Sequence, residues 1–174
     1  MTNENHYTYI KELEEKQLSD FQSLKEDLKQ QRKGLYTVVE DAVKHFFTFT
    51  QKEGITADHF TRGSLYNFFD KIRKNGFFAI DKGVFDRVWF VESEEKPLYS
   101  NGLLKKDPAI AQLLDENQQW ISDLLHSIEK SYWWDQFYKR LIKNVTLLAV
   151  LKSLQEEIIA IKEEENILPI SEFN

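Results

Sequence analysis

The stretch YWWDQFYKRLIKNVTLLAVLKSLQEEIIAIKEEE, residues 132–165, carries the strongest helical pattern of the chain. Apolar residues recur there at every third or fourth position between Lys, Gln and Glu, which is the spacing of one face of an α-helix. Pro169 lacks the N–H that a helix interior requires, so we expect the helix to end before it. The residues of this stripe are Trp133, Phe137, Leu141, Ile142, Leu148, Leu151, Leu154, Ile158 and Ile161. The stretch predicts one long helix and a mainly α fold.

The N-terminal part of the chain predicts a second long helix. From about residue 5 to residue 33 a narrow apolar seam follows one face of a highly charged segment. Gly34 is expected to interrupt this helix, and a second helix with a broader apolar face then runs to Gly54, a suitable C-terminal cap. The seam consists of Ile10, Leu13, Phe21, Leu24 and Leu28.

Shorter elements are expected in the middle of the chain. Thr56 can cap a turn, and Ser64 can cap a short helix that Gly76 ends. Residues 77–106 form the least helical region, with a short irregular or strand segment; within it, residues 84–91 fit a strand or a helix equally well.

Another helix is expected to begin at Asp107 and Pro108, a good N-cap followed by a residue that needs no N–H there, and to reach about Ile128. Together these patterns predict a helical bundle with two long helices and several short ones. They are expected to form a single helical domain over residues 1–174, since a chain of this length is the size of one ordinary domain.

Composition narrows the possible functions. The chain contains no cysteine, which removes disulfides, thiolate metal sites and a cysteine nucleophile. No run approaches the roughly 18 consecutive apolar residues of a membrane span, so we expect a soluble, cytoplasmic protein that does not use a membrane. The formal net charge of −6 has the wrong sign for a surface that holds phosphates everywhere, so any contact with nucleic acid has to be local.

Motifs for nucleotide binding and hydrolysis are missing from the sequence. It has no phosphate-binding loop, no G-x-G-x-x-G pattern and no G-x-S-x-G nucleophile turn. Asp123 with His126 and Asp41 with His45 have the spacing of paired metal ligands on a helix, but the further carboxylates of a two-metal bundle are missing. Polar pairs on the helix surface are the favoured interpretation, and no cofactor or metal is expected in this chain.

Two stretches combine features of nucleic-acid binding. In SYWWDQFYKR, residues 131–140, aromatic rings alternate with Lys139 and Arg140, as in surfaces that stack single strands. Core packing of Trp133 and Phe137 is favoured there, with the neighbouring aromatic residues on other faces as candidates for exposure. These neighbours are Tyr132, Trp134 and Tyr138.

The most concentrated positive charge lies in TRGSLYNFFDKIRKNG, residues 61–76, where only Asp70 opposes four basic side chains. These four basic side chains either form a solvated helix face or contact phosphate groups, and the sequence leaves both interpretations open. The candidate DNA-binding residues are Arg62, Lys71, Arg73 and Lys74. A second basic pair, Lys105 and Lys106, carries less weight.

The closing segment LKSLQEEIIAIKEEENILPISEFN resembles the part of UvrD/Rep-like superfamily 1 DNA helicases, especially the RecB/AddA-like helicase-nucleases, that precedes the second ATPase motif. KEGITADHFTRGSLYNFFDKIRKNGF also looks like the inserted 1B subdomain of such enzymes. The resemblance implies that residues 166–174 begin the connection back to an ATPase core, with Ile170, Ser171, Glu172 and Phe173 at the start of that return.

The same resemblance implies an accessory subdomain excised from an ATP-dependent helicase that acts in DNA repair or recombination. ATP and Mg²⁺ would bind elsewhere in the parent protein, and this chain alone would be inactive as an ATPase. Its partners would be single-stranded or junction DNA and the remaining helicase domains. The alternative is a non-enzymatic helical module that binds another protein through the seam of the first long helix.

Overall fold

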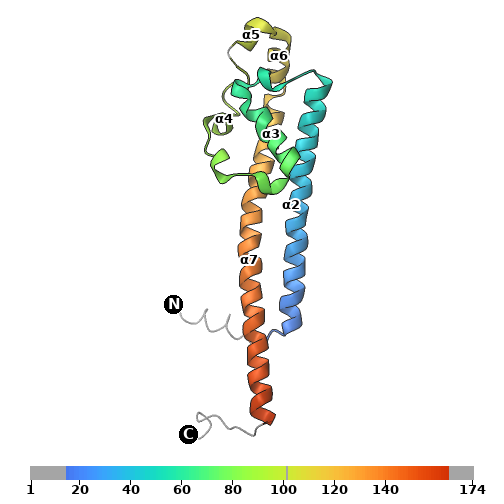
Figure 1. Cartoon of the computed structure of the whole chain (residues 1–174), viewed down its shortest axis with the longest axis vertical. Helices are drawn as coiled ribbons and strands as arrows, with labels where there is room; N and C mark the ends of the chain where they lie inside the picture. Colours follow the sequence, from blue (N-terminus) through green and yellow to red (C-terminus); the bar gives the residue numbers. More distant parts are fainter. Residues whose placement is uncertain (1–14, 101, 165–174) are drawn as a thin grey trace. The chain divides into compact units, whose positions relative to one another are not determined.

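The structure is a computed structural model that describes residues 15–100 and 102–164 (Figure 1). Those residues are mainly α-helical, and no β-strand occurs among them; Phe60 and Tyr99 form an isolated bridge. The α-helices are α2 (Leu18–Lys52), α3 (Ser64–Asn75), α4 (Val88–Val91), α5 (Leu103–Lys106), α6 (Pro108–Glu116) and α7 (Gln118–Glu164). The predicted fold, a mainly α bundle with two long helices and several short ones, is confirmed.

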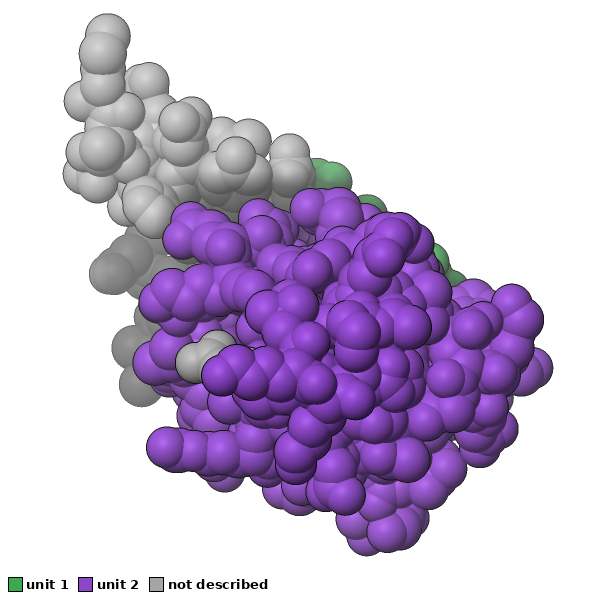
Figure 2. All heavy atoms as spheres, turned by 90° about the horizontal axis from the view of Figure 1, so that it is seen from above, with its two compact units in different colours: residues 1–31, 137–174 green, residues 32–136 purple. Residues whose placement is uncertain are grey.

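The chain divides into two compact units, which Figure 2 colours separately. The first comprises residues 1–31 and 137–174, and the second comprises residues 32–136. Each long helix contributes residues to both units. The single domain expected over residues 1–174 stays a prediction, and its connection at residues 166–174 lies outside the described residues.

The interruption predicted at Gly34 is wrong, because α2 continues through this residue. A glycine inside a helix costs about 1 kcal/mol relative to alanine, a penalty that surrounding residues and packing can offset. A Cβ at Gly34 would meet no atom within 4 Å. The expected end at Gly54 is confirmed: its φ is +67°, and the N–H of Ile55 donates to the carbonyl of Thr50 over 2.8 Å.

The expected start of α6 is also confirmed, since Asp107 Oδ1 accepts the N–H of Ile110 at 3.1 Å and Pro108 is the first helical residue. The extent predicted for this helix is wrong, because α6 ends at Glu116 and α7 then runs without a break past Ile128. No Gly or Pro stands between residues 128 and 132 to stop it. Two predicted helices therefore join into one.

Residues 77–106 contain short helical turns separated by irregular backbone. The tight turns are Phe77–Ala79 and Lys82–Val84, and α4 and α5 follow. Residues 84–91 were expected to form either a strand or a helix, and the structure shows a helix at Val88–Val91. Two further tight turns, Ala57–His59 and Thr61–Gly63, precede α3.

The core of the second unit is mostly aromatic and aliphatic. Its clearest contact joins α2 to α3, where the rings of Phe46 and Phe69 stack with centroids 4.0 Å apart and planes 9° from parallel. Helix α7 adds three fully buried apolar side chains, Ile121, Leu125 and Ile128. Full burial of each such apolar side chain contributes about 1.5–3 kcal/mol, so this unit has a core of its own.

A charged group lies inside this unit as well. Asp135 is 0% exposed, and its Oδ1 accepts the Nε–H of Arg32 at 2.6 Å and the hydroxyl of Tyr36 at 3.3 Å. Burial and the neighbouring Asp135 charge raise the pKa of Tyr36 above its ordinary value. The ion pair and hydrogen bonds offset the cost of burying the carboxylate.

The first unit has a smaller core, formed by Phe21, Leu28 and Val145. Phe21 and Leu28 belong to the predicted first-helix seam. Of the other seam residues, Leu24 is exposed, and Ile10 and Leu13 lie outside the described residues. Several large apolar side chains on α7 remain exposed in this unit. They are Leu147, Val150, Leu151, Leu154, Ile158, Ile159 and Ile161.

Of the helices that the structure describes, none has both the length and the apolar character required to cross a membrane.

Candidate functional site

Helix α3 places the basic segment on the surface of the second unit. Gly63 (φ +64°) precedes the helix and Gly76 (φ +74°) follows it, and the N–H of Gly76 donates to the carbonyl of Ile72 at 2.7 Å. Ser64, expected to be the cap, is instead the first helical residue, after Gly63. The apolar side of α3 is buried; its members are Leu65, Phe68, Phe69 and Ile72. The basic residues therefore face outward.

Two of the four predicted DNA-binding residues already have a carboxylate partner. Arg73 and Lys74 both pair with Asp70, and the Lys74 Nζ lies 2.6 Å from Asp70 Oδ2. The hydrogen bond from Lys74, with a further one from Arg73, holds the pKa of Asp70 below its ordinary value. The Arg73 guanidinium also lies 4.1 Å from the centre of the Phe47 ring. Both cations are exposed but partly neutralised.

The other two, Arg62 and Lys71, line a cavity of about 290 Å³ together with Arg87. All three side chains are exposed, and none forms an ion pair or side-chain hydrogen bond with another residue of the described ranges. Asp81 is the carboxylate in the lining, and its Oδ1 accepts the N–H of Gly83 at 2.8 Å. We call this space the cationic cavity. Three positive charges against one negative charge favour an anion there.

Backbone geometry fixes the position of Arg62. Its φ and ψ are 52° and 22°, in the left-handed region that side chains other than glycine seldom adopt. The following residue, Gly63, is left-handed too, and a Cβ there would come within 3.0 Å of Asn67 Nδ2. Such strain is costly by about 1–3 kcal/mol and concentrates at functional sites. The strained turn therefore holds Arg62 at the edge of the cationic cavity.

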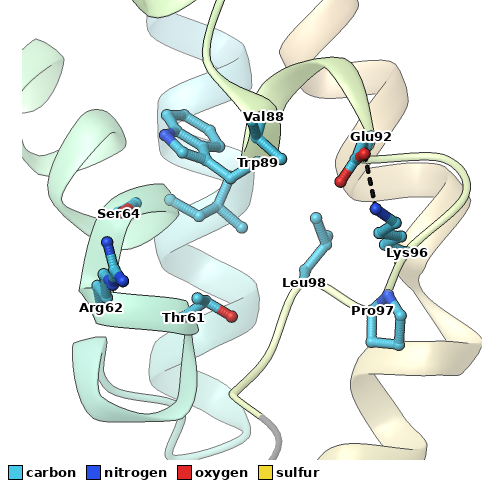
Figure 3. A pocket seen from close by; sticks show the side chains of 10 residues that line it. Thr61, Arg62, Ser64, Val88, Trp89, Glu92, Lys96, Pro97 and Leu98 are labelled. Atoms are coloured by element: carbon cyan, nitrogen blue, oxygen red, sulfur yellow. Dashed lines mark hydrogen bonds and ion pairs between the residues drawn. The ribbon is translucent and has the colours of Figure 1, made fainter.

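A second cavity of about 360 Å³ shares Arg62, Ser64 and Trp89 with the first. Figure 3 shows the indole of Trp89 reaching toward the side where Ser64 and Arg62 lie, away from Glu92 and Lys96. Those two residues form an ion pair of 2.7 Å across from it. The rest of the lining is largely apolar: Leu65, Val88, Pro97 and Leu98. We call this space the apolar cavity.

Trp89 brings an unsatisfied hydrogen-bond donor to the two cavities. Its Nε1 is buried and has no hydrogen-bond partner among the described residues, although the ring packs against Phe68 and Phe90. An indole N–H can only donate, and leaving it unpaired costs about 1–3 kcal/mol. Buried donors of this kind are usually hydrogen-bonded, and none of the described residues supplies an acceptor here.

The other candidates from the sequence lie away from these cavities. Trp133 and Phe137, for which core packing is favoured, are 43% and 51% exposed, so that prediction is wrong. The helix instead turns Tyr132 and Asp135 toward the core of the second unit. Trp134 is exposed as the sequence suggested, and so are Lys105 and Lys106 of α5.

Neither of the two pairs with metal-ligand spacing belongs to a larger ligand group in the described ranges. His126 Nδ1 lies 3.3 Å from Glu94 Oε1, a contact that the sequence does not indicate. Across residues 15–100 and 102–164, no group of three acidic or histidine side chains is placed to hold a metal ion.

The chain matches no protein-family model, no curated protein and no solved structure. Its function is therefore inferred from the cavities and from the sequence resemblance. Arg87 and Trp89 were missed by sequence reasoning, because they lie in the region of weakest pattern and more than ten residues beyond the basic segment. The sequence RVW at residues 87–89, with a cation two positions before an aromatic ring, is the pattern that could have indicated these two residues.

Proposed function

We propose that this chain is a DNA-contacting helical subdomain of the 1B type, part of an ATP-dependent DNA helicase of the UvrD/Rep superfamily. The parent enzyme couples ATP hydrolysis to translocation along single-stranded DNA and to strand separation, in the cytoplasm, for DNA repair or recombination. ATP and Mg²⁺ bind to other helicase domains, which are partners of this subdomain.

The observation that supports the proposal best is the cationic cavity. Arg62, Lys71 and Arg87 gather there in a chain whose net charge is −6, and none of the three pairs with another described side chain. Backbone phosphates are the part of DNA that exposed Arg and Lys side chains contact irrespective of sequence. Arg73 and Lys74 are weaker contacts in this proposal, since both already pair with Asp70.

The proposal is tested with the chain and fluorescently labelled single-stranded and forked DNA, by anisotropy at several salt concentrations. Lys71→Glu is compared with Lys105→Glu, an equal change of charge at another exposed lysine of the same unit. Lys71→Glu should weaken binding and lower the salt slope by about 1, as expected for one lost phosphate contact.

Equal effects of Lys71→Glu and Lys105→Glu would contradict the proposed interface, and a wild-type chain without DNA affinity would contradict the function. Asp70→Asn supplies an independent check. It releases Arg73 and Lys74 from their carboxylate partner and should strengthen binding.

The second candidate function, a helical module that binds another protein, is favoured by the exposed apolar residues of α7. Leu147, Leu151 and Leu154 recur at spacings of four and three, the pattern of a helix-pairing seam. The interaction would use α7, because Phe21 and Leu28 of the predicted first-helix seam already pack within the first unit. Sedimentation over a range of concentrations tests it: self-association that Leu151→Glu removes would favour this function.

A further inference from the structure

We infer that the cationic cavity and the apolar cavity together bind the phosphorylated end of a DNA strand, with the terminal phosphate monoester in the former and its nucleoside in the latter. The identity of the strand as DNA rests on the proposed function. The preference for a monoester rests on the charges, the donors and the lining of the two cavities.

The charge of the cationic cavity matches a monoester better than an internal phosphodiester. Arg62, Lys71 and Arg87 contribute three positive charges, and Asp81 contributes one negative charge. A phosphate monoester carries about −1.5 to −2 at pH 7 and presents three strong acceptor oxygens. A phosphodiester within a strand carries −1, which leaves one of the two excess positive charges of the cavity uncompensated.

The hydrogen-bond donors point to the same class of ligand. Trp89 Nε1 has no acceptor among the described residues, and the indole belongs to the lining of both cavities. Ser64, whose hydroxyl can also donate, is shared by both as well. Because Nε1 is closed to solvent, an acceptor reaches it only after a side chain that covers the indole N–H moves.

The apolar cavity is suited to the nucleoside, the organic part of the phosphate ester. It adjoins the cationic cavity through Arg62, Ser64 and Trp89, and Leu65, Val88 and Leu98 line it. The Glu92–Lys96 ion pair on its other side is internally neutralised, so no free charge opposes a sugar and base there. Volumes of about 290 and 360 Å³ lie at the lower end of the roughly 300–1,000 Å³ typical of small-molecule pockets.

The experiment compares four probes with the chain by calorimetry and by NMR of the indole N–H signals. The probes are one short single strand bearing a 5′-phosphate, the same strand with a 3′-phosphate, the same strand with hydroxyl ends, and inorganic phosphate. Trp89→Phe assigns the relevant indole signal. One of the phosphorylated strands should bind about ten- to a hundredfold more tightly than the hydroxyl strand, the range expected for added charge-assisted hydrogen bonds.

Substitutions test which side chains cause the preference for a phosphorylated strand end. Arg62→Gln and Arg87→Gln should each remove most of this preference, whereas Lys105→Gln, the loss of one exposed positive charge outside both cavities, should keep it. Arg62 and Arg87 are exposed, so both variants are expected to fold, which circular dichroism checks.

The outcomes separate this inference from the proposed function. Equal binding of all three strands would overturn the inference and leave the proposed function standing. In another outcome, a phosphorylated strand binds tightly, inorganic phosphate shifts the Trp89 signal, and the hydroxyl strand has no affinity. This result would support the end-binding site and count against general DNA contact. Absence of any binding would overturn both.

Discussion

Helix α7 contains two regions that differ in burial although their helical pattern is similar. In the second unit its residue Leu125 is 0% exposed, whereas in the first unit Leu151, the same residue type on the same helix, is 62% exposed. Apolar residues recur at helical spacing in both regions. Periodicity therefore identifies which side chains share a face, but it does not say whether another element covers that face.

The difference has a physical cause in each unit. Around Leu125 the second unit gathers buried side chains from α2, α3 and α6, including Phe46, Phe69 and Leu114. In the described part of the first unit, α2 offers only Phe21 and Leu28 to the small core at Val145. Burial depends on the number of elements that converge, which is a tertiary property.

The largest expected effect comes from truncating the two leucines. Leu125→Ala should lower the free energy of unfolding by about 2–5 kcal/mol, because it removes buried contacts and leaves a cavity. Leu151→Ala should change it by less than about 0.5 kcal/mol, as for most exposed positions. Denaturant unfolding of both variants measures the difference, and equal losses would show that Leu151 is covered in solution.

The next largest effect is expected at Asp135, the buried carboxylate of the second unit. Asp135→Asn keeps the shape but removes the charge that faces Arg32, and should lower the free energy of unfolding by about 2–3 kcal/mol. It should also bring the pKa of Tyr36 down toward its ordinary value, since the Asp135 charge is one cause of the increase. Spectrophotometric titration of tyrosine follows this second change.

The control for Asp135 lies in the first unit, where the Glu26–Lys29 pair is largely exposed. Glu26→Gln should alter the free energy of unfolding by no more than about 0.5 kcal/mol, because solvent screens such pairs. A loss at Glu26 as large as that at Asp135 would contradict the distinction between the buried and the exposed region.

Apart from the two control variants, the smallest effect is expected at Asp70, at the surface of the second unit. Its pKa is lowered in the folded chain, so its contribution is fully present above the ordinary value of 3.8 and is lost as the pH falls through the lowered folded value. The difference in stability between the wild type and Asp70→Asn should be within about 1 kcal/mol, constant from pH 7 to about 5, and smaller below about pH 4. A difference that instead grows on acidification would contradict the sign of this shift.

Features set by local backbone chemistry could be predicted from the sequence. Asp107 with Pro108, Gly54 and Gly76 act within a few residues of themselves, and all mark helix ends as expected. Gly34 misled the prediction because its weak intrinsic preference against a helix is overridden by the rest of α2.

The candidate site could be predicted only in part. Charge density identified Arg62 and Lys71, but their convergence with Arg87 depends on the path of residues 77–106, where no periodic pattern guides a prediction. Trp133 was assigned to the core because it shares the helical spacing of the apolar stripe, whereas the buried position two residues later is taken by Asp135, whose contacts include Arg32 and Tyr36.

The open space around Gly34 has a practical consequence. A Cβ at this position meets no atom within 4 Å, and the chain has no cysteine of its own. A Gly34→Cys variant would therefore carry a single thiol on the outside of α2. A spin label or fluorophore attached there would follow the motion of this helix without disturbing the aromatic core or either cavity.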